Sequence, residues 1–470
     1  MTIMKFGRQI ATLSVAAMLL AGCSTQSSID NATITPDLPS NWQQAQLGED
    51  VNVHWLSQTS NPQLAALVYK ALSNNRSLKQ QAYGLAIQEQ QVDISKADLW
   101  PEIDFSLNSS RQASGDPTSY SNNNSLAVDV SYEIDIWGKL SDATKQDHLT
   151  YLASKANYLN AKNQLISDVL NSYFELVSAQ QLHALFKQRV DLSKENLDII
   201  SSGYKQGLNE ALDVYLARND LNAELSSLAN QQARVQQASA AIEQLVGDYP
   251  AGTLVAANDI PILLDNLDIG VPSTLIKKRP SLQASWYELL AQDAALAFAH
   301  KQRFPSIRLS GSYGTQANEL DDLLSGSSIA WSLLGGISAP LFNAGQLKAV
   351  EEQQALRLKQ NEQAYLDSMF QAFAEIEQGI TQEKSIKTQY NSTLAAKENA
   401  MIAQTLAFEQ YQNGLVSYTT VLDAQERAFN AQSNVISLKN QLITNRINLY
   451  VALGGDFTDG LIKNELTNEN

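Results

Sequence analysis

The chain has 470 residues, and its 33 Lys and Arg against 49 Asp and Glu give a formal net charge of −16. This excess argues against a nucleic-acid partner, because nothing would offset the repulsion from the phosphates. One Cys and four His scattered along the chain argue against a zinc site of the Cys/His type. The sequence carries no nucleophile motif, no paired metal ligands and no Gly-rich phosphate loop. We therefore expect no catalysis, no metal and no cofactor.

The first residues carry the pattern of an export signal. Two cations precede an apolar run from Ile10 to Leu20, which is shorter than the roughly 20 residues that span a bilayer. The run ends in Leu20-Ala21-Gly22-Cys23, which resembles the bacterial lipobox, whose Cys receives a lipid and becomes the new N-terminus. The alternative is an ordinary signal with a chance Cys. We predict a signal peptide over 1–22 and a lipidated linker over 23–61, and Ser24 after the Cys favours the outer membrane.

Two sequence marks occur twice in the chain at nearly the same separation. Trp100-Pro101 returns as Phe304-Pro305, 204 residues later, and Tyr204-x-x-Gly207-Leu208 returns as Tyr411-x-x-Gly414-Leu415, 207 residues later. Two offsets held over tens of residues indicate two copies of one unit. The predicted organisation is repeat 1 at 62–249, a connecting segment at 250–272, repeat 2 at 273–455 and a C-terminal tail at 456–470.

Each repeat contains two segments in which apolar and polar residues alternate. The alternation is cleanest between Leu126 and Ile136, where its period is two. A length near 10 with one apolar face is typical of transmembrane β-barrel strands, and four strands of a soluble sheet are the alternative. Strands are predicted at about 102–113, 125–136, 305–316 and 328–340. We expect one loop over 115–117 and Asn122–Asn124, and another over 319–328.

Helical periodicity dominates the rest of each repeat. From Lys139 to about Lys205 apolar residues recur at helical spacing, and no proline falls between Pro117 and Pro250. A helix of roughly 66 residues is about 100 Å long, which no compact domain needs. Further helices are predicted at about 62–98, 210–246, 273–302, 346–413 and 417–453. The fold class is therefore mixed but mainly α, a bundle of long rods in two similar halves with four strands at one end.

Four strands are too few for a barrel with a lumen. The smallest barrels of this class have about eight strands, and their own side chains fill them. Three chains would supply about twelve strands and leave a channel. We therefore expect the chains to associate, with polar side chains toward the lumen and apolar ones toward lipid.

Taken in order, these marks resemble the TolC-type outer-membrane efflux family, in its lipoprotein branch, over about residues 60 to 456. Further marks are Ile136-Trp137-Gly138-Lys139, Leu341-Phe342-Asn343-Ala344-Gly345, Leu212-Asp213-Val214 and Val421-Leu422-Asp423-Ala424-Gln425. The resemblance implies a homotrimer with a 12-stranded outer-membrane β-barrel and a 12-helix periplasmic coiled-coil barrel. Each chain would contribute four strands through two tandem repeats.

The resemblance also implies a function and partners. The protein would be a passive exit duct for drugs or other small molecules, fed by an inner-membrane pump of the resistance-nodulation-division type through a periplasmic adaptor protein. It would lie in the outer membrane of a Gram-negative bacterium, held by the lipid on Cys23. The alternatives are an outlet for type I protein secretion and a non-conducting structural coiled-coil lipoprotein. A copper or silver exporter is disfavoured, because only Met369 and Met401 occur outside the signal.

The resemblance places docking residues at the two points where a long helix must stop and reverse. Glycines there would adopt positive φ at the end of a helix. The residues expected to contact the adaptor are Gly207, Leu208, Asn209, Gly414, Leu415, Val416 and Ser417.

A periplasmic gate is expected just after these tips. Its residues would be Asp423, Thr420 and Asp213, the last of which is the repeat-1 equivalent of Thr420. Three copies of Asp423 around a threefold axis would repel one another when ionised, although Thr420 supplies no charge where the family has an acid. The alternative is that Asp213 and Asp423 pair with Arg218 and Arg427 in the helix walls.

Overall fold

The computed structural model describes residues 42–43, 61–115, 119–257, 259–261, 278–324, 329–455 and 457. The predicted signal peptide and Cys23 lie outside these residues. The chain divides into two compact units. The sheet unit includes Leu85–Lys155 and Ala284–Asp367, and the hairpin unit runs over Asp37–Gly84, Ala156–Gln283 and Ser368–Asn470.

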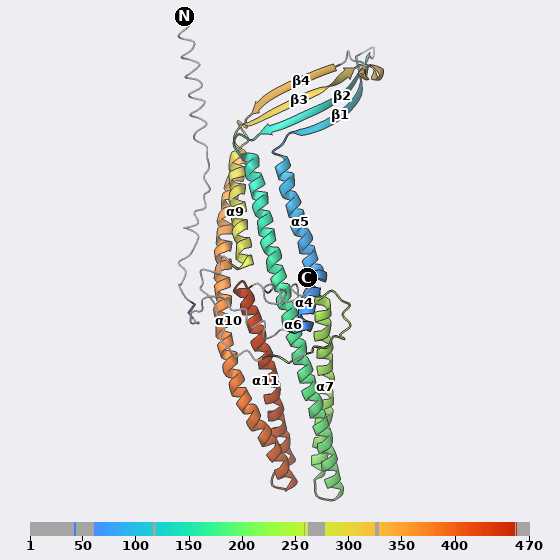
Figure 1. The fold of residues 1–470 in the computed structure, drawn as a ribbon, viewed down its shortest axis with the longest axis vertical. Coiled ribbons are helices and arrows are strands. Elements are labelled where there is room, and N and C mark those ends of the chain that lie inside the picture. The colour runs from blue at the N-terminus through green and yellow to red at the C-terminus, as the bar shows by residue number, and fades with distance from the viewer. Residues whose placement is uncertain are drawn as a thin grey trace, which may run out of the picture. The chain divides into compact units, whose positions relative to one another are not determined.

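Four antiparallel strands form the sheet unit's single sheet (Figure 1). They are β1 (Glu102–Ser114), β2 (Ser119–Ile134), β3 (Ser306–Ala317) and β4 (Ile329–Ser338). They pair in the order β1-β2-β3-β4, so the strand pairs of the two sequence halves join along β2 and β3. A short 3-10 helix, η1 (Leu320–Leu324), follows β3 within the segment predicted as a loop.

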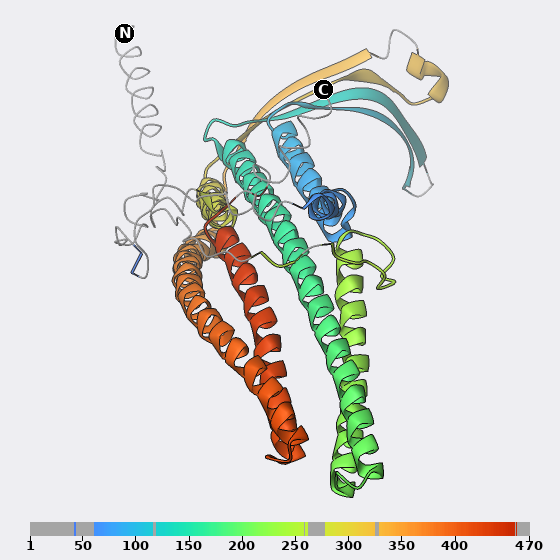
Figure 2. The same ribbon diagram turned by 60° about the horizontal axis from the view of Figure 1, so that its bottom comes forward.

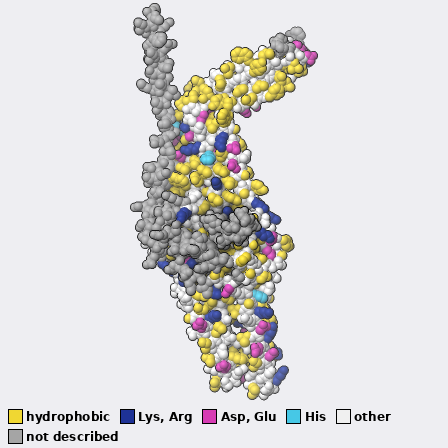
Figure 3. Space-filling view, viewed as in Figure 1, with side chains coloured by type: hydrophobic (Ala, Val, Ile, Leu, Met, Phe, Trp, Pro, Cys, Tyr) yellow, Lys and Arg dark blue, Asp and Glu magenta, His cyan; other side chains and the backbone are white. Residues whose placement is uncertain are grey.

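One face of this sheet is apolar across all four strands. The register places Phe105, Val128, Tyr313 and Trp331 in one row, and every second residue along each strand shares their face. Phe105 and Trp331 are 69% and 75% exposed, and hydrophobic side chains are dense over the strands in Figure 3. On the other face Ser106 donates a hydrogen bond to Asp129 at 2.9 Å. Such a distribution is typical of strands that face lipid on one side.

The second strand begins earlier than its alternation predicts. The predicted loop over Asn122–Asn124 is wrong, because these residues continue the pairing with β1, with Arg111 opposite Asn122. Ser109 donates to the Asn124 side chain at 2.6 Å, and Asn124 Nδ2 donates to the Asn318 carbonyl at 2.9 Å. These polar residues resemble a loop in sequence, but their backbone pairs with β1 and the Asn124 side chain is hydrogen bonded, so they continue the strand. The strand ends at Ile134, two residues before the predicted end at 136.

The single helix predicted over 62–98 is two helices, α4 (Pro62–Asn74) and α5 (Arg76–Ala97). The prediction is wrong at Asn75, whose ψ of 125° leaves the helical region. The Asn75 side chain accepts from the Leu78 N–H and donates to the Leu245 carbonyl, both at 2.9 Å. Asn75 thus caps the start of α5 and contacts the end of α7, and both contacts stabilise the break. In the second half, the described part of the corresponding helix is α9 (Pro280–Lys301).

Two helix hairpins follow the strand pairs. The first is α6 (Lys139–Lys205) with α7 (Ala211–Leu245), and the second is α10 (Gln346–Gln412) with α11 (Tyr418–Ala452). Each long helix has 67 residues and each returning helix has 35. These bounds lie within one residue of the predicted ones. Figure 2 shows that each hairpin turns at its own tip.

The main core of the hairpin unit forms where α4 packs on α6, α7 and α11. Leu64, Val169, Ile242 and Ile447 are fully buried there. Tyr173 joins them, and its hydroxyl accepts from Asn61 Nδ2 at 2.5 Å. This apolar cluster joins the middle of α6 to the ends of α7 and α11 that lie away from the tips.

Candidate functional site

The two tips share one backbone geometry. Gly207 and Gly414 have φ of 75° and 68°, a left-handed conformation that favours glycine. In the first tip the Leu208 N–H donates to the Gly203 carbonyl at 2.9 Å, and in the second the Leu415 N–H donates to the Gln410 carbonyl at 2.9 Å. These bonds close a Schellman motif, which satisfies the last carbonyls of α6 and α10 and reverses the chain.

Each tip presents one leucine to solvent. Leu208 is 76% exposed and Leu415 is 73% exposed. Asn209 is held by a hydrogen bond from its Nδ2 to the Ile200 carbonyl at 3.1 Å. Val416 is half-buried, and Ser417 occupies the cap position before α11 with its Oγ 2.6 Å from the hydroxyl of Thr419. The predicted docking residues therefore lie together on each turn, with the leucines outermost.

The three predicted gate residues do not form one cluster in a single chain. Asp213 accepts a hydrogen bond from the Tyr411 hydroxyl at 2.9 Å. Asp423 pairs with Arg427, one turn along the same helix, at 3.0 Å, and both side chains are mostly exposed. The Thr420 hydroxyl lies 3.3 Å from that of Ser417. The pairing of Asp423 with Arg427 is one of the two arrangements that the sequence left open.

Tyr411 is a site residue that the sequence analysis missed. It lies on α10 and its partner Asp213 lies on α7, so this bond ties the two hairpins together near their tips. Burial, and next the hydrogen bond to Asp213, raise the pKa of Tyr411, so its hydroxyl stays a donor at any physiological pH. The repeated Tyr-x-x-Gly mark was a signal for the turn, but the partner across the hairpins could not be read from it.

A small apolar core supports this link. Ile200, Val214, Tyr418 and Val421 are buried between the two tips, and the Tyr411 and Tyr418 ring centroids are 5.4 Å apart. Burial raises the pKa of Tyr418 as well, so it remains neutral. The equivalent of Tyr411 in the first tip, Tyr204, is 49% exposed. The two tips thus share a turn but differ in what surrounds their tyrosines.

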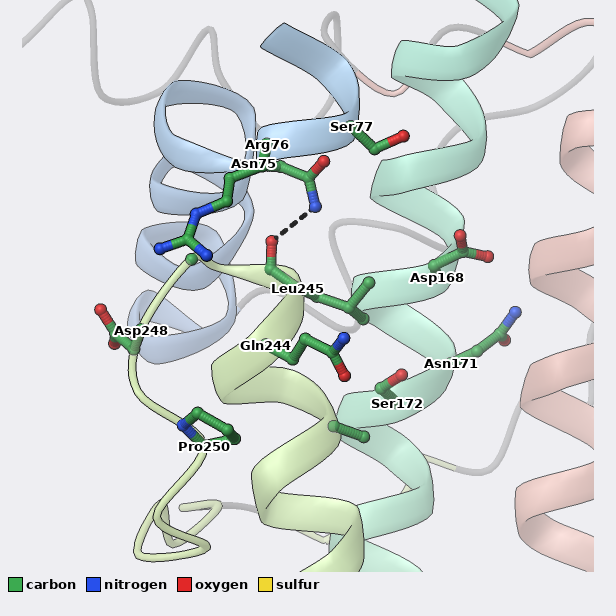
Figure 4. Close-up of a pocket in the computed structure, with 12 residues that line it drawn as sticks. Asn75, Arg76, Ser77, Asp168, Asn171, Ser172, Gln244, Leu245, Asp248 and Pro250 are labelled. Atoms are coloured by element: carbon green, nitrogen blue, oxygen red, sulfur yellow. Dashed lines mark hydrogen bonds between the residues drawn. The ribbon is translucent and has the colours of Figure 1, made fainter. Parts of the chain in front are cut away.

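The described residues contain no group of three or more His, Cys, Asp or Glu placed to hold a metal ion. No helix in the described part of the chain is both long enough and apolar enough to cross a membrane. The hairpin unit also contains a cavity lined by residues of α5, α6 and α7, shown in Figure 4.

Comparison with known proteins decides the family. The sequence model described as "Outer membrane efflux protein" matches residues 67–248 and 271–455, once in each half of the chain. The chain belongs to the outer membrane efflux protein family. Its predicted family and its predicted place in the outer membrane are therefore confirmed.

Two relatives of this efflux protein cover nearly its whole length. The toluene efflux pump outer membrane protein TtgC of Pseudomonas putida is 28% identical over 469 residues, which are 95% of this chain and 96% of that one. A Salmonella typhimurium protein named "Probable outer membrane lipoprotein SilC" is 26% identical over 411 residues, 86% of this chain and 88% of that one. Both relatives are named as outer-membrane proteins.

A solved structure has the same fold. The CmeC outer membrane channel of Campylobacter jejuni superposes with a TM-score of 0.82 at 24% identity, over 95% of this chain and 97% of that one. The predicted fold, mainly helical with a four-stranded sheet, is thus confirmed at the level of one chain. The docking, gate and lipidation residues stay predictions, and Cys23 lies outside the described residues.

Proposed function

We propose that this efflux protein is the outer-membrane channel of a tripartite efflux system. It would be a passive exit duct for small molecules, fed by an inner-membrane pump through a periplasmic adaptor. The observation that carries the proposal is the combination, in one chain, of a sheet with a continuous apolar face and two long helix hairpins with exposed leucines at their tips. The apolar sheet face is suited to lipid, and the exposed leucines at the tips are suited to a protein partner.

A duct of this kind requires several chains. Within the described residues, β1 and β4 each pair along one side only. An edge strand is a template for pairing with another chain, and a sheet within lipid needs every backbone group paired. We infer a homotrimer, in which two tandem repeats per chain give a 12-stranded β-barrel and a 12-helix coiled-coil barrel. The double match of the family model supports the repeats.

The tips are the proposed docking surface for the adaptor. Leu208 and Leu415 are the most exposed large hydrophobic side chains there, and each stands on a turn closed by a backbone hydrogen bond. Burying an exposed leucine is worth about 1.5–3 kcal/mol, which a helical partner with its own apolar tip could supply. Asn209, Val416 and Ser417 would form the rim of the contact.

The same region contains the proposed periplasmic gate. Three copies of Asp423 would form a ring of carboxylates around the axis, and Arg427 would partly neutralise each of them. Asp213, tied to Tyr411, would hold the two hairpins of a chain together in the closed state. Thr420 would line the constriction without charge. Opening would require the Asp213–Tyr411 hydrogen bond to break or move.

We further propose that the mature protein begins at Cys23 and carries a covalent lipid there. The lipobox-like Leu20-Ala21-Gly22-Cys23 supports this, and the relative SilC is named as a probable lipoprotein. The diacylglyceryl group of a lipobox Cys carries two acyl chains, and two chains anchor a protein stably, so the lipid would hold the N-terminal segment at the membrane in addition to the sheet.

Conductance through a planar bilayer tests the duct and the gate together. The parent is compared with Asp423→Ala and with Tyr411→Phe. Asp191→Ala is the matched control, because Asp191 is equally exposed and forms a similar ion pair with Lys194 on α6, outside the tips. We expect a small conductance in the parent and the control, and a larger one in both gate variants.

Each outcome of that experiment assigns the roles differently. A large, unchanged conductance in all four proteins would keep the channel and remove Asp423 and Tyr411 from its gate. No conductance in any protein shown to be inserted and oligomeric would overturn the channel and leave a structural coiled-coil lipoprotein.

A further inference from the structure

The apolar face of the sheet does not extend over the whole length of β1 and β2. Counted from the end that α5 and α6 adjoin, its rows are apolar as far as the pair of Leu107 and Leu126 (Figure 1). Beyond that pair the same face is mostly polar. The outer rows pair Ser109 with Asn124, Arg111 with Asn122, and Ala113 with Tyr120. The part of the face that is suited to lipid therefore ends before the two strands do.

The height of the apolar rows matches the apolar interior of a membrane. From Ile134 to Leu126, β2 is about 27 Å long at about 3.4 Å per residue, or roughly 20 Å high at the tilt of about 40° that is typical of membrane barrels. With the reach of the side chains, this approaches the apolar band of about 25 Å in such barrels. Arg111 is two rows beyond Leu107, which by the same measure is about 10 Å higher. It therefore lies at the level of the lipid headgroups.

Arg111 differs from the other cation of the sheet in the face that it occupies. Within the described residues of the four strands, only Arg111 and Arg308 are Lys or Arg. Arg308 lies on the polar face, opposite Glu133, whereas Arg111 lies on the face that is apolar nearer the helices. A cation on the lipid side of a sheet is costly at the membrane midplane and costs little near the interface. The position of Arg111 beyond the apolar rows satisfies that condition.

The guanidinium of Arg111 has an aromatic contact but no counter-ion in the described part of the chain. Its Cζ lies 4.6 Å from the centre of the Tyr120 ring, and no described carboxylate forms an ion pair with it. The acids Asp321 and Asp322 belong to η1, after β3, and β2 separates β3 from β1. A cation–π contact leaves the N–H groups of a guanidinium able to donate at its edge, and they form a fork that fits two phosphate oxygens.

We propose that Arg111, positioned by Tyr120, binds the phosphate of an anionic lipid in the leaflet farther from the helices. A lipid, rather than free phosphate, is the occupant because Arg111 lies on the lipid-facing side of the sheet, at headgroup level. Asn122, opposite Arg111 on the same face, would offer an amide donor beside it. The inference rests on the proposed membrane sheet and adds the class of lipid that the sheet recognises.

The second half of the chain contains no equivalent of this site. At the offset of 204 that relates β1 to β3, Thr315 takes the place of Arg111. The described residues of β3 and β4 carry no Lys or Arg on the apolar face, since Arg308 lies on the other one. Each chain therefore offers one such site, and the number of tightly bound lipids should equal the number of chains.

Native mass spectrometry of the full chain in neutral detergent tests the site. Phosphatidylglycerol is the probe, and a diacylglycerol with the same acyl chains is the phosphate-free comparison. The parent should bind about one phosphatidylglycerol per chain in preference to diacylglycerol, and Arg111→Gln should bind it several-fold more weakly. Arg308→Gln is the matched control, because it removes a cation from the other face of the same sheet, and it should bind like the parent.

Two further variants separate charge from geometry. Arg111→Lys keeps the charge but loses the fork and the stacking on the ring, so its affinity for phosphatidylglycerol should fall between those of the parent and Arg111→Gln. Tyr120→Leu removes the ring that positions the guanidinium, and it should weaken binding less than Arg111→Gln does. Binding should also weaken at high salt, because the contact is exposed.

The outcomes that contradict the proposal are distinct. Equal binding by the parent and Arg111→Gln would overturn the site, and so would equal losses in Arg111→Gln and Arg308→Gln, which would indicate attraction by net charge alone. Displacement of the lipid by inorganic phosphate at the same concentration would overturn lipid as the occupant. Failure of the proposed function gives another result, in which the parent does not float with vesicles of phosphatidylethanolamine and phosphatidylglycerol.

Discussion

The two hairpins have the same lengths and turns but contain different buried side chains. In the second, Arg446 on α11 is 1% exposed and hydrogen bonds to Glu383 on α10, which is itself buried. At the equivalent positions of the first hairpin, 207 residues earlier, stand Leu176 and Ser239, both fully buried. The same space is therefore filled by an ion pair in one hairpin and by a leucine with a serine in the other.

The first hairpin has its own ion pair at another level. Arg189 lies 2.8 Å from Glu224, whose side chain is buried, and the equivalent positions in the second hairpin are Ala396 and Ala431. Burial raises the pKa of Glu224, and the neighbouring Arg189 guanidinium acts in the opposite direction. Hairpin length and turn geometry are thus compatible with more than one interior. An internal repeat therefore predicts the shape of a hairpin more reliably than the chemistry of its interior.

The largest effect is expected from breaking the pair in the second hairpin. Arg446→Ala leaves the buried Glu383 without its arginine and paired with Lys387 at 3.2 Å. Removing one partner of a buried pair costs about 3 kcal/mol or more. The midpoint of thermal unfolding, followed by helical circular dichroism in detergent, should fall accordingly.

The first hairpin supplies the control for this change. Glu383→Leu combined with Arg446→Ser places in the second hairpin the residues that the first already holds. We expect the double variant to recover most of the lost stability, because it removes the buried carboxylate together with its arginine. A double variant as unstable as Arg446→Ala would mean that the two interiors are not interchangeable.

A second, smaller effect concerns the segments that follow the hairpins. In the last turn of α7, the Glu243 carboxylate accepts hydrogen bonds from N–H groups of the segment that follows the helix. The donors are Gly252, Thr253 and Leu254, at 2.6, 2.9 and 3.0 Å. After α11, the equivalent residue is Tyr450, which packs on Phe457 with ring centroids 4.7 Å apart. One connection is therefore held by a carboxylate and the other by aromatic rings.

Glu243→Gln should destabilise the protein by about 2 kcal/mol at pH 7, since a charged acceptor is lost. Burial alone would raise the pKa of Glu243, but these hydrogen bonds lower it overall. A lowered pKa contributes stability that is present above the ordinary value of about 4.3 and is lost as the pH falls. The gap between parent and variant midpoints should therefore be constant from pH 7 to about pH 5 and shrink as the pH falls below about 4.3. A gap that does not change with pH would contradict this role.

The sequence predicted these hairpins well and their interiors poorly. Long-range helical periodicity and the absence of proline gave α6, α7, α10 and α11 to within a residue, because a helix is local. The break at Asn75 was missed because its cause is a hydrogen bond to Leu245, 170 residues away. The link from Tyr411 to Asp213 was missed for the same reason.

In the candidate site, too, local features could be predicted from the sequence and contacts between distant residues could not. Tip glycines were predictable because a helix that reverses requires positive φ, a backbone demand visible in one residue type. Which acid faces which partner depends on how the two hairpins pack, and the sequence left Asp423 with two readings. Asp423 pairs locally, with Arg427 one turn along its own helix, whereas the partner of Asp213 lies on the other hairpin.

The tips themselves allow a test of what the hairpins share. Gly207→Ala and Gly414→Ala should each cost about 1 kcal/mol, because the left-handed conformation is strained for any residue with a Cβ. An added Cβ would meet no atom within 4 Å at either position, so backbone strain is the whole effect. Equal shifts in the thermal midpoint are expected. Clearly unequal shifts would show that the two turns differ in more than their side chains.

The smallest effect on stability is expected at Asp423, which follows the second tip, and a larger one at Asp213, which follows the first. Asp213→Asn weakens a part-buried hydrogen bond between hairpins and should cost about 1 kcal/mol. Asp423→Asn removes an ion pair whose side chains are 63% and 74% exposed, and such pairs contribute well under 1 kcal/mol, screened further by salt. Midpoints measured for both variants at low and high salt should therefore separate them, with Asp423→Asn near the parent throughout. If Asp423→Asn proved as destabilising as Asp213→Asn, its carboxylate would have to be held by groups beyond its own helix, as a ring of three copies would provide.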